Sequence, residues 1–161
     1  MAVTLHTDLG DIKLELFCDL TPKTCENFLA LCASGYYNDC SFHRNIKSFM
    51  VQTGDPTGTG KGGTSIWNKK FEDEFHDNLK HNARGIVSMA NSGPDTNGSQ
   101  FFIIYGKQPS LDMKYTVFAK VIDGFDTVDD LEKLPVDDKS FRPKSEVKIR
   151  RITIHANPLA D

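Results

Sequence analysis

The sequence lacks long apolar runs, and no segment approaches the ~18 consecutive apolar residues that mark a membrane-spanning helix. The first ten residues, MAVTLHTDLG, also lack the basic cap and apolar run of a secretory signal. Basic residues are not in excess, because 19 Lys and Arg stand against 22 Asp and Glu, for a net charge of -3. A dedicated nucleic-acid binder normally shows a basic stripe. We therefore expect an intracellular protein, nuclear or cytoplasmic, that is not secreted and contacts neither a membrane nor nucleic acid directly.

Cysteine is sparse, and no two cysteines have C-x-x-C spacing; the four are Cys18, Cys25, Cys32 and Cys40. This pattern favours buried free thiols over disulfides or a metal site. The five histidines also lack the spacing of metal ligands. The acidic segment FEDEF, residues 71–75, is more typical of a solvated turn than of a metal site. The sequence therefore predicts neither a metal nor a cofactor.

The glycine-rich segment lacks the context of a nucleotide site. Gly58, Gly60 and Gly63 form a literal G-x-G-x-x-G, yet no helix pattern follows to receive a pyrophosphate. A P-loop is also excluded, because Gly62 stands where its Ser or Thr should be. We interpret residues 55–70 as a long, flexible surface loop.

Short alternating apolar runs predict a mainly β protein with two helices. Residues 3–16 read as an antiparallel hairpin around the turn DLGD. Thr21 and Pro22 are typical of an N-cap and first helical residue, and Gly35 is placed to end that helix after about fourteen residues. A second, short helix should stop before Pro135.

The last apolar segment changes parity near Arg150 and Arg151, which predicts a β-bulge there. A chain of 161 residues is most simply one domain, covering residues 1–161. No strand-helix-strand alternation repeats, so a parallel doubly wound sheet is excluded. From the residues alone, a sandwich and a barrel both remain open.

One arginine has an unusual setting. Arg44 stands in a short polar break that is followed by the apolar run Phe49 to Val51. A guanidinium is planar, permanently charged and rich in donors, so it suits electrostatic stabilisation better than proton transfer. The plain alternative is that Arg44 is a surface charge and its apolar neighbours belong to the core.

Two segments together decide between these alternatives. Residues 37–54, YNDCSFHRNIKSFMVQTG, and residues 89–102, MANSGPDTNGSQFF, resemble the two hallmark segments of the cyclophilin family of peptidyl-prolyl cis-trans isomerases. The resemblance extends from about Val3 to Ile154. It implies a closed eight-stranded antiparallel β-barrel capped by two α-helices, and an enzyme that rotates X-Pro peptide bonds.

The resemblance also assigns roles to residues of this chain. Arg44 becomes the catalytic donor, with Gln52 orienting its guanidinium. The proline ring is expected in an apolar pocket formed by Phe49, Met50, Phe102 and Leu111. The remaining substrate-binding positions are Gly60, Ala90, Asn91, Ser92, Gln100 and Tyr115. Of these, Ala90 and Asn91 hold the peptide backbone with Gln100 beside them, while Gly60 and Ser92 border a neighbouring pocket.

Two positions depart from the family pattern. Ser110 replaces the tryptophan of cyclophilins that bind cyclosporin strongly, so we expect weakened cyclosporin binding. Tyr115 stands where the best-known members have histidine.

The expected partners are proline-containing peptides and proteins, and the expected state is a monomer. Resemblance to one sub-group of single-domain cyclophilins further implies spliceosomal proteins as partners. The expected role is therefore an isomerase that assists folding or switches proline conformers, within the spliceosome in particular. The alternative function is a proline-peptide binding scaffold of a splicing complex with little catalytic role.

Overall fold

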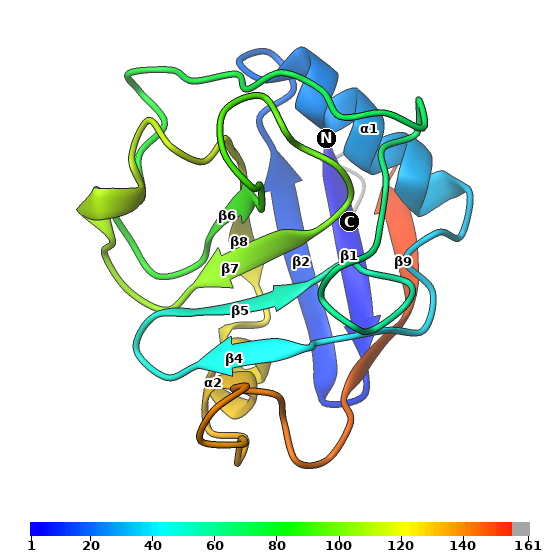
Figure 1. Cartoon of the computed structure of the whole chain (residues 1–161), viewed down its shortest axis with the longest axis vertical. Coiled ribbons are helices and arrows are strands. Elements are labelled where there is room, and N and C mark those ends of the chain that lie inside the picture. The colour runs from blue at the N-terminus through cyan, green and yellow to red at the C-terminus, as the bar shows by residue number, and fades with distance from the viewer. Residues whose placement is uncertain (156–161) are drawn as a thin grey trace.

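The computed structural model describes residues 1–155 and shows a mainly β protein with two α-helices (Figure 1). The end of the domain predicted for residues 1–161 lies outside this range. Within it the strands are β1 Ala2–Thr7, β2 Gly10–Leu16, β3 Cys40–Ser41, β4 Arg44–Ile46, β5 Met50–Thr53, β6 Ile86–Met89, β7 Phe101–Ile104, β8 Val117–Asp123 and β9 Lys148–His155. The helices are α1 Pro22–Ala33 and α2 Phe125–Glu132, and a short 3-10 helix, η1, covers Pro109–Leu111.

The strands form one antiparallel sheet in the order β3-β9-β1-β2-β8-β6-β7-β5-β4. The two strands at the ends of this order are consecutive in the chain, separated only by Phe42 and His43. The Phe42 amide donates to the Val147 carbonyl next to β9, and the His43 amide donates to the Gln52 carbonyl in β5. One continuous segment therefore joins the two edges of a strongly curled sheet.

The predicted mainly β, antiparallel fold with two helices is confirmed. The described sheet has nine strands instead of eight, because the segment from residue 40 to residue 46 is interrupted at Phe42 and His43. Helix α1 lies across one end of the sheet and α2 lies near the opposite end (Figure 1).

The predicted bulge lies in β9. His6 of β1 faces Arg151, while the next residue, Thr7, faces Ile149, so Arg150 is the extra residue. A bulged residue leaves the ladder and turns its side chain to a new direction. The Arg150 guanidinium here forms ion pairs with Asp8 at 2.6 Å and with Asp39 at 3.2 Å.

Helix α1 begins at Pro22, as predicted, but its first turn is capped by a distant residue. The Thr21 hydroxyl makes no capping bond, because it donates to the Phe17 carbonyl. The carboxylate of Glu74 instead accepts hydrogen bonds from the backbone amides of Lys23 and Thr24, at 3.2 and 2.6 Å. A carboxylate at this position satisfies free amides and complements the helix dipole. The FEDEF segment is therefore not simply a solvated turn, since its Glu74 is half-buried and caps α1.

Apolar side chains gather in two separate clusters on opposite faces of the sheet. The main core fills the interior, where the Phe28 ring packs at 5.1–5.4 Å from those of Tyr37, Phe101 and Phe118. The second cluster is centred on Met50, Phe102 and Ile104. Phe101 and Phe102 are consecutive and both buried, yet they belong to different clusters because adjacent strand residues point to opposite faces.

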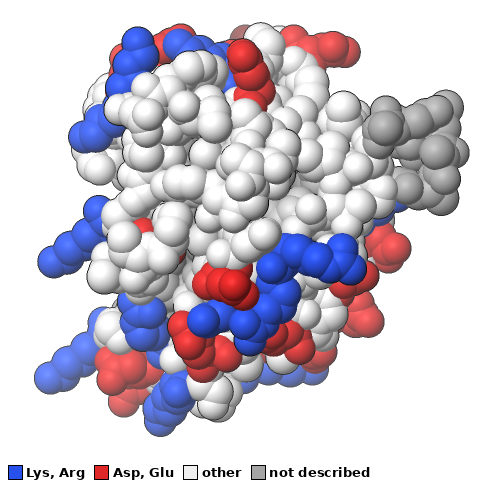
Figure 2. Space-filling view, turned by 90° about the vertical axis from the view of Figure 1, so that its right-hand side faces the viewer, with Lys and Arg blue, Asp and Glu red and all other residues white. Residues whose placement is uncertain are grey.

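The charged side chains of one molecular face are shown in Figure 2. Blue Lys and Arg and red Asp and Glu are interspersed over its lower part, and uncharged residues cover most of its centre. This face therefore carries no continuous basic stripe. The helices described for residues 1–155 are all too short or too polar to cross a membrane.

Candidate active site

Four neighbouring strands place three predicted site residues and Ser88 in one row across the sheet. Arg44 of β4 faces Gln52 of β5, Gln52 faces Phe102 of β7, and Phe102 faces Ser88 of β6. Directly opposed residues in an antiparallel sheet share a face. The apolar residues that alternate with this row, such as Val51, point to the opposite face and enter the main core. The row of Arg44 therefore lies on the face that points away from the core.

The second apolar cluster occupies this same face and contains six of the predicted site residues. Met50 and Phe102 are 3% and 4% exposed and form its floor. Packed against the floor are four further predicted residues, Phe49, Ala90, Leu111 and Tyr115, together with Ile46 and Ile86. The rings of Tyr115 and Phe102 meet edge to face at 5.4 Å. This cluster has the composition of a site for a compact apolar ring.

Arg44 stands exposed at the edge of this cluster. Its guanidinium forms no hydrogen bond or ion pair with any of residues 1–155. The side chain of Gln52 donates from Nε2 to Gln100 Oε1 at 2.8 Å. The Gln52 side chain is thus held by Gln100 and makes no hydrogen bond to Arg44 within residues 1–155, so its orienting role stays a prediction.

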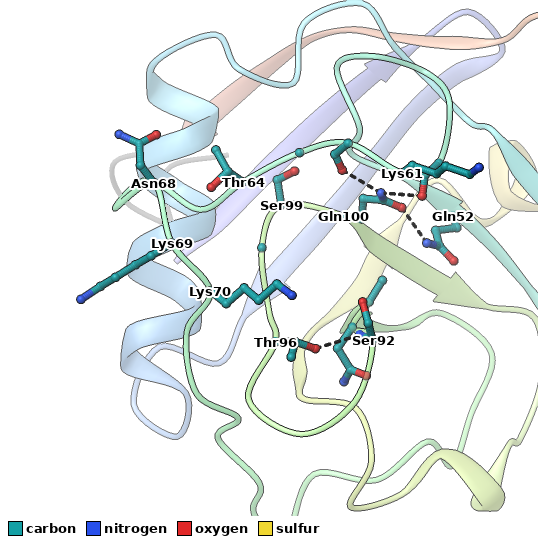
Figure 3. Close-up of a pocket in the computed structure, with 16 residues that line it drawn as sticks. Gln52, Lys61, Thr64, Asn68, Lys69, Lys70, Ser92, Thr96, Ser99 and Gln100 are labelled. Atoms are coloured by element: carbon teal, nitrogen blue, oxygen red, sulfur yellow. Dashed lines mark hydrogen bonds between the residues drawn. The ribbon is translucent and has the colours of Figure 1, made fainter.

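A polar pocket of about 690 Å³ adjoins the apolar cluster (Figure 3). Predicted site residues contribute to its wall, namely Gln52, Gly60, Ala90, Asn91, Ser92 and Gln100. Gln52 and Ala90 border both the pocket and the apolar face. The pocket and the apolar cluster are therefore contiguous.

The buried carboxylate of Asp55 fixes the glycine loop at the edge of the pocket. It accepts hydrogen bonds from the backbone amides of Gly60 and Gly62 at 2.7 and 3.0 Å. Burial raises the pKa of Asp55, but these bonds and those from Thr57 outweigh it and hold the pKa below its usual value. Gly60 has a φ of +87°, and a Cβ on Gly62 would approach the carboxylate at 2.6 Å. The loop is thus held in place by one residue beneath it.

Gln100 connects this loop to the row of residues that contains Arg44. Gln100 Nε2 donates to the carbonyls of Gly60 and Gly62 at 3.0 and 2.9 Å, and Gln100 Oε1 accepts from Gln52 (Figure 3). An amide with all these partners has a fixed orientation. Gln52, opposite Arg44, is therefore anchored to the loop through Gln100.

A buried histidine packs against the floor of the apolar cluster. The imidazole of His81 is fully buried, with Nδ1 at 2.8 Å from Asp112 Oδ1 and Nε2 at 2.7 Å from Ser88 Oγ. Its ring stacks on Phe102 at 6.3 Å between centroids. Burial lowers the pKa of His81, and the contact with Asp112 opposes this only in part. Burial raises the pKa of Asp112, but hydrogen bonds from His81 outweigh it and lower the pKa.

The Ser-His-Asp arrangement resembles a catalytic triad, but it is closed to substrate. Ser88 and His81 are 0% and 1% exposed, so no acyl group reaches the serine hydroxyl. The His81 ring contacts Phe102 in the floor of the apolar cluster, and Asp112 directly follows Leu111. It holds the walls of the site and takes no part in hydrolysis.

The structure brings all twelve predicted site residues onto one side of the sheet, in the row, the cluster or the pocket. Sequence reasoning missed His81, Asp112 and Ser88, as well as the anchor Asp55. Of these four, only Ser88 stands within an apolar run, and Asp112 lies 31 positions from His81, so no local pattern marks the group.

This face combines an exposed arginine, an apolar cluster and a polar pocket. A family model described as cyclophilin type peptidyl-prolyl cis-trans isomerase/CLD matches residues 2–154, and the chain belongs to this family. It is 78% identical over 160 residues to peptidyl-prolyl cis-trans isomerase-like 3 of Gallus gallus, with 99% of both chains covered. The Homo sapiens protein of the same name is 76% identical over 160 residues, again with 99% of both chains covered.

Solved structures agree with this assignment. A cyclophilin type peptidyl-prolyl cis-trans isomerase of Cryptosporidium parvum, crystallised in the presence of the dipeptide Ala-Pro, superposes with a TM-score of 0.94. It is 53% identical, and the match covers 98% of this chain and 100% of that chain. The predicted membership of the cyclophilin family is confirmed.

Proposed function

We propose that this chain accelerates rotation about X-Pro peptide bonds in proteins, with Arg44 as the catalytic residue. The observation that carries the proposal is the position of a guanidinium with no partner among residues 1–155 at the edge of the second apolar cluster. The barrier to rotation, roughly 18–20 kcal/mol, comes from the loss of amide resonance. No covalent bond forms or breaks, and no cofactor enters the reaction.

Arg44 lowers this barrier by acting on the twisted state alone. In that state the proline nitrogen is no longer conjugated and carries a lone pair, which accepts a hydrogen bond from the guanidinium. In the planar ground state the nitrogen is a poor acceptor, so the bond is made only near the transition state. The interaction therefore raises the rate without tightening substrate binding.

The neighbouring residues hold the substrate while it rotates. The proline ring packs on Met50 and Phe102 and is flanked by Phe49, Leu111 and Tyr115. The adjoining peptide is held along Ala90 and Asn91, where Asn91 is itself fixed by a hydrogen bond to the Lys114 carbonyl at 2.9 Å. With the ring fixed, rotation moves the other side of the X-Pro bond.

Isomerisation of an Ala-Pro test peptide, followed by magnetisation exchange, tests the proposal. Uncatalysed exchange takes tens to hundreds of seconds, and the wild-type chain is expected to shorten it in proportion to its concentration. A folded wild-type chain that leaves the rate unchanged would overturn the proposal.

We further propose that its protein substrates include spliceosomal proteins, and that its cellular site is nuclear at least in part. This rests on the sub-group resemblance of the sequence. The measurement is copurification from nuclear extract with wild type and with Arg44→Ala. Recovery of splicing proteins by both would favour a scaffold role alongside catalysis, and recovery by neither would contradict the association.

A further inference from the structure

Three lysines line the polar pocket next to the apolar cluster, and they differ in direction. Figure 3 shows Lys70 extending toward the interior of the pocket, between Gln100 and Thr96. Lys61 lies near Gln52 and Gln100, whereas Lys69 points away from the pocket. The Lys70 ammonium group therefore points into the pocket, whereas that of Lys61 lies on the side of Gln52, where the pocket meets the apolar cluster.

Neither of these two ammonium groups is neutralised by a protein carboxylate. Among residues 1–155, the side chains of Lys61 and Lys70 form no hydrogen bond or ion pair. Lys23, by contrast, pairs with Glu72 at 2.8 Å. Glu72 has a lowered pKa, chiefly through the hydrogen bond from Lys23 and with a smaller contribution from the charge of Lys69. Lys69 thus faces the Lys23–Glu72 pair and not the pocket.

The rest of the pocket wall offers donors and no competing anion. Of the described residues that line it, three are lysines and none is Asp or Glu. The nearby Asp55 carboxylate lies beneath the loop, where it accepts from Thr57, Gly60 and Gly62. This local positive charge occurs in a chain whose net charge is -3, so it does not follow from the overall composition. A wall of this kind attracts an anion.

We propose that Lys61 and Lys70 make this pocket selective for substrates with an acidic side chain close to the isomerised proline. The inference rests on the proposed function, because Gln52 and Ala90 connect the pocket to the cluster that takes the proline ring. An extended chain advances roughly 3.3–3.6 Å per residue, so a side chain within about three residues of the proline reaches the pocket. Each exposed ion pair changes affinity by up to about fivefold, and the two lysines together are expected to give about three- to tenfold.

The test uses eight-residue proline peptides in which Glu, Ala or Lys is placed in turn at each of the three positions before and after the Ala-Pro pair. Isomerisation and binding are measured with wild type, with Lys61→Ala/Lys70→Ala and with the matched control Lys69→Ala. Wild type and the control are expected to prefer Glu over Lys by about three- to tenfold at one position at least. The double variant should lose this preference while it retains its rate on the Ala peptide.

The outcomes separate this inference from the proposed function. Equal rates and affinities for Glu and Lys peptides at every position would overturn the inference, while acceleration of the Ala peptide would still support the isomerase. A preference that persists in the double variant, or that does not weaken as salt rises from 0.05 to 0.5 M, would also overturn it, since exposed ion pairs are screened. If wild type does not accelerate isomerisation of the Ala peptide, the proposed function is contradicted. The binding measurements still report the charge preference in that case.

Discussion

Arg44 and Gln52 lie directly opposite each other on β4 and β5, on the face of the sheet that points away from the core. The side chain of Gln52 is tied through Gln100 to the loop that Asp55 holds. The guanidinium itself has no partner within residues 1–155. An exposed arginine thus lies opposite a glutamine whose side chain is held in place by the loop.

Replacing Gln52 with Ala should lower kcat more than it raises KM. The substitution removes the side chain that faces Arg44 and is bonded to Gln100, and one lost hydrogen bond of about 1–1.5 kcal/mol corresponds to about tenfold in rate. Steady-state isomerisation of a proline peptide measures both constants. Gln52→Glu is the companion variant, because its carboxylate offers an acceptor to Arg44 although it no longer donates to Gln100; it should retain more activity than Gln52→Ala. Wild-type kcat in Gln52→Ala would contradict the positioning role.

The stability of the protein should fall as the pH drops below about 6.5. His81 has a lowered folded-state pKa, so above the unfolded value of about 6.5 both states are neutral and its contribution is fully present. Below that pH the unfolded state binds a proton that the folded state refuses, and stability is lost at up to about 1.4 kcal/mol per pH unit. The buried His43 has a lowered pKa as well and adds to this loss.

Urea unfolding at pH 7, 6 and 5 measures this dependence. In His81→Gln only the contribution of His43 remains, so the slope of free energy against pH should be smaller than in wild type. A stability that is constant between pH 7 and 5, or equal slopes in the two proteins, would rule out the assignment to His81.

Leu111→Ala should weaken the binding of proline peptides by about tenfold. Leu111 is half-buried against the apolar cluster, and removing its branched side chain takes away about 1–2 kcal/mol of apolar contact with a bound ring. Titration calorimetry with an Ala-Pro peptide gives the affinity. Ile122→Ala is the matched control, because Ile122 is an exposed aliphatic residue of β8 outside the cluster. Equal affinities in the two variants would contradict the assigned pocket.

Ser110→Trp should strengthen cyclosporin binding by at least about tenfold. Ser110 is exposed in η1, immediately before Leu111, and an indole there would add a broad apolar wall and an N-H donor. Inhibition titrations of wild type, Ser110→Trp and Ser110→Ala provide the comparison. Nanomolar inhibition of the wild-type chain would refute the predicted weakening.

Local sequence patterns were sufficient for much of the fold. Strand alternation predicted the first hairpin, and the parity change at Arg150 predicted the bulge in β9, because both follow from which face a side chain occupies. Pro22 marked the start of α1 because a proline fits the first helical turn. The same alternation put Phe101 and Phe102 on opposite faces, and so separated the core from the site.

The features that escaped prediction depend on contacts between particular side chains, some of them far apart in the chain. Glu74 caps a helix that begins some 50 positions earlier, and the acidic segment around it gives no local sign of this role. His81 contacts Asp112, which is 31 positions away in the sequence, and Ser88 in β6. The loop after Asp55 was predicted to be flexible because of its glycines, yet several of its amides are fixed by that one carboxylate. Such contacts have no periodicity that a sequence pattern could reveal.

The most direct test of the central claim compares wild type, Arg44→Ala and Arg44→Lys in isomerisation and in binding of the same Ala-Pro peptide. If Arg44 acts on the twisted state, Arg44→Ala should lower kcat by about 10²–10³ with peptide affinity changed less than threefold, as for loss of one transition-state donor. Arg44→Lys should recover little, because a single ammonium does not reproduce the planar guanidinium. A kcat within a few-fold of wild type in a folded Arg44→Ala protein would contradict the account.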